Sequence, residues 1–266
     1  MKFIKMSAAG NDFILFDNRN GALSGGEINF FRQICERRQA IGADGIILLE
    51  KSSVADFRYR HFNSDGSLAE MCGNGARAVC YYAVSRKLVQ PHHRFEIQGV
   101  VHEALVSEDK VKLSMPSPSG LETSLGIVTE DNLEEGGFIV LGVPHLVIFA
   151  NNVTDVDVVN LGKKYWAHPR FKNRTNVNFV QILDSNTIRV RTFERGVEDE
   201  TLSCGTGSVS SAILSHLIKG TEPPFTVQTE GGVLHVNWDD FRQTIYLSGA
   251  AKIVYEGELI PPGSLS

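Results

Sequence analysis

The chain has 266 residues, of which 42% are hydrophobic and 21% are charged, and its formal net charge at pH 7 is −5. This composition excludes a disordered or fibrous chain, and the interspersed charges offer no basic face for a nucleic-acid backbone. No apolar run approaches the roughly 20 residues that a membrane span needs, and the N-terminus lacks an apolar stretch that ends in a cleavage site. We therefore expect a cytoplasmic globular protein with neither nucleic acid nor membrane as a partner.

One stretch of the sequence occurs twice in altered form. Residues 63–78 read Asn-Ser-Asp-Gly-Ser-Leu-Ala-Glu-Met-Cys-Gly-Asn-Gly-Ala-Arg-Ala, and residues 193–208 read Phe-Glu-Arg-Gly-Val-Glu-Asp-Glu-Thr-Leu-Ser-Cys-Gly-Thr-Gly-Ser. Each copy places a cysteine before Gly-x-Gly, and Cys72 and Cys204 lie 132 positions apart, about half the chain. This echo predicts two domains of roughly 130 residues each.

The first half reads as short strands with two helices. Helical spacing of apolar residues predicts a helix at 27–38, and a second helix is predicted at 72–84. The second helix is small or apolar nearly all round except at Arg77, which is typical of a helix enclosed by a sheet. Strands are predicted at 3–6, 13–16, 46–50, 56–62, 94–98, 101–106 and 111–115.

The second half repeats this plan after Pro116-Ser-Pro-Ser-Gly120, a composition break that we interpret as the domain linker. Helices are predicted near 156–166 and at 204–219. Two α/β halves of similar order imply a duplicated fold, with a ligand held in the cleft between the halves. Strands are predicted at 138–141, 146–150, 177–183, 187–193, 225–228, 233–238, 244–248 and 252–255.

The cysteines differ in their sequence context. Cys35 and Cys80 lie among apolar residues of predicted helices and are interpreted as buried core thiols. Cys72 and Cys204 each begin a predicted helix, where the helix dipole favours a thiolate and the first amide N–H groups can hold a carboxylate. Two such sites facing each other would hold one small carboxylate and place a thiol or thiolate on each face of its α-carbon, as a two-base racemase requires. With no Cys-x-x-Cys pair, we expect no metal site.

With these two segments, the chain resembles the diaminopimelate epimerase family over nearly its whole length. Supporting motifs are Ala9-Gly-Asn-Asp-Phe13, Gly-Ala-Asp-Gly45, Pro144-His145 and Thr-Asn-Val-Asn-Phe179. The resemblance implies an α/β (α+β) fold of two similar duplicated domains, each a curved, mainly antiparallel sheet around a central helix. The composition break predicts domains at 1–115 and 116–251, and the resemblance implies that the final strand, within 252–266, can return to the first domain. Val143 departs from the asparagine that is frequent in the family, so recognition of the far end of the substrate is less secure than the reaction.

The resemblance further implies an epimerase that needs no cofactor, uses no pyridoxal phosphate and converts L,L- to meso-diaminopimelate for lysine and peptidoglycan synthesis. It implies that Cys72 and Cys204 are the two bases and that His145 and Glu194 bind or orient near the thiols. A homodimer is left open. Residues expected to contact the substrate are Asn11, Asn63, Gly73, Asn74, Asn176, Glu194, Arg195, Gly205 and Thr206.

Three alternatives stay open on the sequence. A proline or hydroxyproline racemase has a similar architecture and two cysteines, but its substrate would not need Asn63, Asn176 and Arg195 together. A catalytically silent amino-acid-binding protein would not need to keep both cysteines. A pyridoxal-dependent racemase would need a lysine in a suitable context, and none is evident. Asn63 is also a favoured turn residue, and His145 could be a structural histidine.

Overall fold

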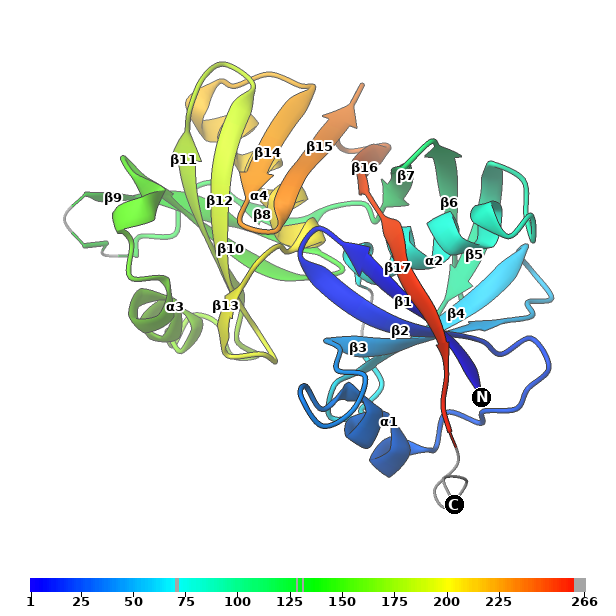
Figure 1. Cartoon of the computed structure of the whole chain (residues 1–266). Helices are drawn as coiled ribbons and strands as arrows, with labels where there is room; N and C mark the ends of the chain where they lie inside the picture. The colour runs from blue at the N-terminus through cyan, green and yellow to red at the C-terminus, as the bar shows by residue number, and fades with distance from the viewer. Residues whose placement is uncertain (70–71, 128, 131, 261–266) are drawn as a thin grey trace. The chain divides into compact units, whose positions relative to one another are not determined.

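The computed structural model describes residues 1–69, 72–127, 129–130 and 132–260 (Figure 1). Contacts divide the chain into two compact units. Unit 1 comprises Met1–Leu113 with the segment from Ala250 onward, and unit 2 comprises Ser114–Gly249. Within the described ranges, no helix is long and apolar enough to cross a membrane.

Unit 1 is a sheet wrapped around one buried helix, α2 (Gly73–Ser85), with the shorter α1 (Ile28–Cys35) on the other face of the sheet. Its last strand is β17 (Lys252–Glu258), which pairs antiparallel with the first strand of the chain. The other strands of this half are β1 (Lys2–Ala8), β2 (Asn11–Asp17), β3 (Gly45–Glu50), β4 (Phe57–Asn63), β5 (His92–Ile97), β6 (Val100–Ser107) and β7 (Lys110–Met115).

Unit 2 has the same plan, with α4 (Gly205–Lys219) as its central helix and α3 (Val158–Trp166) on the other face of the sheet (Figure 1). A short 3-10 helix, η1 (Val153–Asp155), precedes α3. The strands are β8 (Ser119–Glu122), β9 (Leu133–Leu141), β10 (Val143–Ala150), β11 (Asn176–Ile182), β12 (Thr187–Glu194), β13 (Asp199–Thr201), β14 (Phe225–Thr229), β15 (Gly232–Trp238) and β16 (Ile245–Ala250).

The strand pairings repeat in the same order in both halves. From β1 to β6, successive neighbours pair antiparallel, parallel, antiparallel, parallel and antiparallel. The series β9, β10, β11, β12, β14 and β15 gives the same sequence of pairings. Each half then adds one more antiparallel neighbour, β7 and β16 respectively. The predicted duplicated α/β fold with mainly antiparallel sheets is therefore confirmed.

The burial of β3 shows why helices occupy both faces of the sheet. All residues of Gly45–Glu50 are buried, as expected for a strand that is covered on both sides. Ile46 and Leu48 pack in the cluster that includes α1, whereas Ile47 and Leu49 pack against α2. Side chains of a strand alternate between its faces, so the continuous apolar run builds two cores at once.

Three details differ from the sequence predictions. The helix predicted at 27–38 ends at Cys35, where the extended backbone of Glu36 stops it. Ser119 and Gly120, which we placed in a linker, belong to β8, a strand that pairs with β9. β13 is a short strand that follows the turn after β12, and its polar residues carry no alternating pattern that would predict it.

Candidate active site

The two repeated cysteines occupy the same local structure. Cys72 is the N-cap of α2, with φ −112° and ψ 113°, and Cys204 is the N-cap of α4, with φ −117° and ψ 116°. Each Sγ accepts a hydrogen bond of 3.4 Å from the backbone N–H of the glycine three residues later, Gly75 or Gly207. Both cysteines are half-buried. The helix N-terminus therefore stabilises negative charge on either sulfur.

Cys35 and Cys80 have different surroundings. Both are buried in apolar clusters. Burial raises the pKa of the Cys35 thiol to about 12 and raises the pKa of the Cys80 thiol well above its usual range. The prediction that these two are core thiols is confirmed.

Polar side chains surround the N-terminus of α2. The phenol of buried Tyr59 donates to the backbone carbonyl of Cys72 at 3.2 Å. Asn74 follows Cys72 by two residues, is only 2% exposed, and donates its amide to Oδ1 of Asn11 at 2.6 Å. The Asn11 amide donates in turn to the Asp44 carboxylate at 3.0 Å. Two predicted site residues, Asn11 and Asn74, therefore lie in direct contact.

The N-terminus of α4 carries a different set of contacts. Oγ1 of Thr206 lies 3.5 Å from Sγ of Cys204 and 2.9 Å from Nε2 of His145. His145 is fully buried, and its Nδ1 faces the Asn178 amide nitrogen at 3.3 Å. The same nitrogen donates to the Leu146 carbonyl at 2.9 Å, while Oδ1 of Asn178 accepts from Thr192 at 3.0 Å.

These contacts fix the direction of the hydrogen bonds of His145. Because the Asn178 amide nitrogen only donates, Nδ1 of His145 must accept, and the ring proton then lies on Nε2. Nε2–H donates to Thr206, and the threonine hydroxyl can donate to Cys204 when this sulfur is a thiolate. Burial, with a smaller contribution from Arg195, lowers the pKa of His145 to about 3, so the ring is neutral near pH 7. As a thiolate, the Cys204 sulfur thus has one hydroxyl donor and one amide donor.

Asn176, Glu194 and Arg195 meet at one edge of unit 2. Asn176 donates to the Pro144 carbonyl at 3.0 Å and accepts from the Arg195 backbone N–H at 2.8 Å. Glu194 accepts from the Thr201 hydroxyl at 2.9 Å. These contacts hold the turn after β12 against the strand that carries His145, so the predicted residues of unit 2 share one neighbourhood.

Asn63 has the turn contacts that its alternative interpretation requires. Its amide donates to the Ser67 hydroxyl at 3.0 Å, and its backbone N–H donates to the Ser67 carbonyl at 2.8 Å. Its side chain is exposed. The residue therefore forms the turn and keeps an accessible amide.

Sequence reasoning did not select Asn178 or Tyr59 for the site. Asn178 lies in the Thr-Asn-Val-Asn-Phe motif at a strand position that is fully buried, and a buried amide in an apolar strand is the signal that could have found it. Tyr59 alternates with Phe57 on one face of β4 and carries no signal beyond that of a core aromatic.

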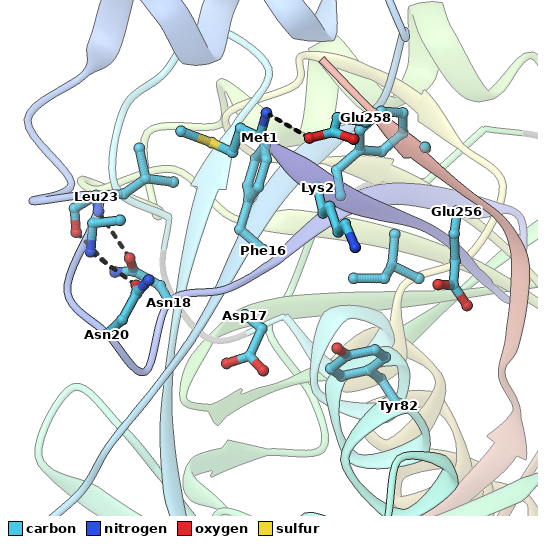
Figure 2. A pocket seen from close by; sticks show the side chains of 14 residues that line it. Met1, Lys2, Phe16, Asp17, Asn18, Asn20, Leu23, Tyr82, Glu256 and Glu258 are labelled. Atoms are coloured by element: carbon cyan, nitrogen blue, oxygen red, sulfur yellow. Dashed lines mark hydrogen bonds and ion pairs between the residues drawn. The ribbon is translucent and has the colours of Figure 1, made fainter. Parts of the chain in front are cut away.

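Unit 1 also has a hollow of about 650 Å³ away from the cysteine. Figure 2 shows Asp17, Tyr82 and Glu256 around it, together with the start of β1. None of the predicted site residues lines this hollow. It lies near the later turns of α2, whereas Cys72 caps the first turn.

Solved structures with a similar fold include two kinds of protein. A PhzF-family phenazine biosynthesis protein from Bacillus anthracis matches 98% of this chain and 99% of its own, with a TM-score of 0.75 and 16% identity. A probable proline racemase from Agrobacterium radiobacter matches 98% of this chain and 93% of its own, with a TM-score of 0.66 and 14% identity. These likenesses define the fold class of the chain, a two-domain fold in which each half is a sheet around a central helix.

A family model for diaminopimelate epimerase matches residues 3–119 and 137–254. Proteins named diaminopimelate epimerase are 40% identical in Aquifex aeolicus, over 97% of this chain and 98% of that protein, and in Chlorobaculum tepidum, over 96% and 99%. The one from Archaeoglobus fulgidus is 38% identical over 97% of this chain and 95% of its own length. The chain belongs to the diaminopimelate epimerase family and is an isomerase.

Proposed function

We propose that the chain inverts one α-carbon of L,L-diaminopimelate to give meso-diaminopimelate, in lysine and peptidoglycan synthesis, with Cys72 and Cys204 as the acid–base pair. The observation that carries this proposal is the matching N-cap geometry of the two cysteines, whose φ and ψ agree within 5°. The domains we assign are 1–115 with 252–266, and 116–251, and each contributes one thiol. A cytoplasmic location and a homodimer stay predictions.

The reaction conserves protons. A thiolate on one face of the α-carbon removes the α-proton and becomes a thiol, and the electron pair of the C–H bond passes into the substrate carboxylate. The thiol on the opposite face then protonates the α-carbon and becomes a thiolate. Each turnover therefore exchanges the protonation states of Cys72 and Cys204, and the reverse reaction uses the same two groups in exchanged roles.

The helix N-termini supply the charge stabilisation that this step needs. The first amides of a helix have no partner within the helix and point along the positive end of the dipole. Those of Gly73, Asn74, Gly205 and Thr206 stand next to the two thiols, and we assign the reacting carboxylate to them. Negative charge that develops on this carboxylate is stabilised by donors already in place.

The neutral His145 acts through Thr206. Because its Nε2–H donates to the threonine oxygen, the threonine hydroxyl can donate to the Cys204 sulfur when this sulfur is a thiolate. A hydrogen bond to sulfur stabilises the thiolate. We assign His145 and Thr206 to holding Cys204 ready as a base, and Glu194 to orientation of the nearby turn through Thr201.

The far end of the substrate carries a second amino group and carboxylate. Arg195 can bind a carboxylate with two parallel hydrogen bonds, and Asn176 fixes the backbone of Arg195. Asn11 and Asn63 add amide groups from unit 1. We assign these four residues to substrate binding, which a substrate with one carboxylate would not need.

A deuterium experiment tests the reaction and the assignment together. Purified protein without added cofactor is incubated in deuterated water with L,L-diaminopimelate or, separately, with L-proline. We expect α-deuterium and inversion with diaminopimelate only. Inversion of proline instead would assign the chain to the proline racemases, and no exchange with either would indicate a binding protein.

Single cysteine variants test the two-base mechanism. Cys72→Ala and Cys204→Ala should each abolish inversion, because each stereoisomer presents its α-hydrogen to one sulfur and needs the other for reprotonation. Cys80→Ala, which removes a buried core thiol, is the matched control and should still invert the substrate. Near wild-type inversion by either active-site variant would exclude the mechanism. The rate should be bell-shaped in pH, since the pair needs one thiolate and one thiol.

A further inference from the structure

Arg77 is buried in an unusual way. It lies on α2, one turn beyond the Asn74 amide, with 0% of its surface exposed, and it is the largest of the fully buried side chains among the described residues. Its Nη2 donates to Oδ1 of Asn74 at 2.5 Å, and within the part of the chain that the structure describes its Nε and Nη1 have no hydrogen-bond partner. A buried cation without an anionic partner is unfavourable, so the fold keeps this charge at a cost in stability.

The arginine stands at one end of a directed chain of hydrogen bonds. Arg77 donates to Asn74, Asn74 donates to Asn11, and Asn11 donates to the Asp44 carboxylate. A guanidinium can only donate and an ionised carboxylate can only accept. The two ends therefore fix both amides in one orientation, with the Asn11 oxygen turned toward Asn74. Both asparagines are residues that we assign to substrate binding.

Among the residues that the structure describes, each carboxylate that the strands direct toward α2 is paired with a cation other than Arg77. Alternation along the strands that pack against α2 places eight titratable side chains on the face toward this helix: Lys2, Asp17, Tyr59, His61, His93, His102, Glu256 and Glu258. Glu256 is paired with Arg86, and Glu258 with the N-terminal ammonium group. Asp17 is paired with Arg19. Burial raises the pKa of Tyr59 and lowers the pKa of His61 to about 4, so both are neutral at pH 7.

Within α2 itself, burial keeps Cys80 a neutral thiol. Burial also lowers the pKa of Arg77 to about 10, and Cys72 acts in the opposite direction, so the guanidinium stays charged at pH 7 and lies within electrostatic range of this sulfur. Asp44, at the far end of the chain, is already paired with Arg37 at 2.7 Å.

We infer that Arg77 is a positioning residue of the Cys72 half of the site, which supplies the buried positive charge for the Cys72 thiolate and fixes the amides of Asn74 and Asn11. The inference rests on the proposed function, because it concerns the same sulfur. Its distinctive consequence is that removal of the charge should harm the thiolate without harming the fold.

The first test measures the Cys72 thiolate directly. Wild-type protein and Arg77→Met are alkylated with iodoacetamide across a pH series, and the rate at Cys72 is followed by peptide mapping. We expect the pH midpoint of alkylation at Cys72 to rise by about one to two units in Arg77→Met, because the thiolate loses a neighbouring positive charge. The midpoint at Cys204 in the same samples should not move. An unchanged midpoint at Cys72 overturns the proposal.

Stability and a charge-retaining variant separate the two parts of the role. Arg77→Met should unfold at or above the wild-type temperature, because it replaces a desolvated charge with an apolar side chain. Arg77→Lys keeps the charge but not the planar fork, so the Cys72 midpoint should return toward wild type while KM stays raised at least several-fold. Loss of folding by both variants would make the residue structural and overturn the inference.

Arg86→Met is the matched control, because this arginine caps the same helix at its other end and pairs with Glu256 at the surface. In this variant, the pH midpoint of alkylation at Cys72, the KM and the activity should equal those of wild type. The alkylation result for Arg77→Met can be judged separately from the two-base mechanism. If Cys72→Ala protein were active, the two-base mechanism would be excluded, whatever the role of Arg77. If Cys72→Ala is inactive and Arg77→Met still has a wild-type midpoint, only the role of Arg77 is excluded.

Discussion

Gly75 and Gly207 occupy equivalent positions, three residues after the capping cysteines, yet they should respond in opposite ways to alanine. A Cβ on Gly75 would lie 3.6 Å from Cβ of Cys72 and from Cδ1 of Ile47, which is ordinary contact. A Cβ on Gly207 would lie 2.3 Å from Oδ1 of Asn178. The glycine of the second copy is thus required by the amide packed against it.

The size of the effect follows from what holds Asn178. Its oxygen would have to retreat by roughly 1 Å, which disturbs the hydrogen bonds to Thr192, Leu146 and His145. Three buried hydrogen bonds at about 1 kcal/mol each, with a further cost for any group left without a partner, give roughly 3–5 kcal/mol. Alanine recovers up to about 1 kcal/mol as the better helix former. We expect a net destabilisation of about 2–4 kcal/mol for Gly207→Ala.

Urea denaturation of Gly207→Ala and Gly75→Ala checks this reasoning. Gly75→Ala should be neutral or up to about 1 kcal/mol more stable than wild type. Activity should fall in Gly207→Ala even below the unfolding transition, because displacement of Asn178 frees His145 to rotate. Equal stability of the two variants within about 0.5 kcal/mol would refute the claim that Asn178 is rigidly held.

Arg195→Lys should lower kcat/KM for diaminopimelate at least tenfold while sparing α-deuterium exchange of short amino acids, and equal losses would mean that Arg195 does not read the far carboxylate. Burial lowers the pKa of His61 from 6.5 to about 4, so between these values the unfolded chain binds a proton that the folded protein does not. The free energy of unfolding should therefore decrease by about 1.4 kcal/mol per pH unit as the pH falls through this window, and His61→Leu should remove that share of the slope in acid titrations followed by denaturation. Tyr59→Phe removes the donor to the Cys72 carbonyl and should cost about 1 kcal/mol of stability with less than a tenfold loss of kcat/KM. A loss beyond a hundredfold would place the phenol in the chemistry.

Local patterns predicted the elements that carry the site. The Gly-x-Gly segments gave both central helices within one residue at their starts, because a helix that is apolar all round is distinctive. The two repeated segments were recognisable because in each one the cysteine is followed by small residues, which a helix N-terminus tolerates. The structure adds a direct hydrogen bond between Asn74 and Asn11. No local sequence pattern could predict this contact, because 63 positions separate the two residues.

What the sequence did not predict depends on long-range contacts. Asn178 and Tyr59 are ordinary strand residues until the fold places them against a helix start. β8 and β13 consist of short, largely polar segments, and they are strands only because β9 and β12 offer them partners. Arg77 stood out as the one charged residue of an apolar helix, but its buried environment emerges only from the sheet that encloses it.

The pairing of β17 with β1 has a consequence for synthesis on the ribosome. β1 pairs with β2 along one edge and with β17 along the other, so the first strand to be made waits for the last. Along the sequence, unit 2 is one continuous segment that separates the two parts of unit 1. During translation the second-made unit can therefore complete its sheet while the first-made unit still has an open edge. The start of the chain therefore depends on its end, and a premature stop before Lys252 leaves one edge of β1 without a partner strand.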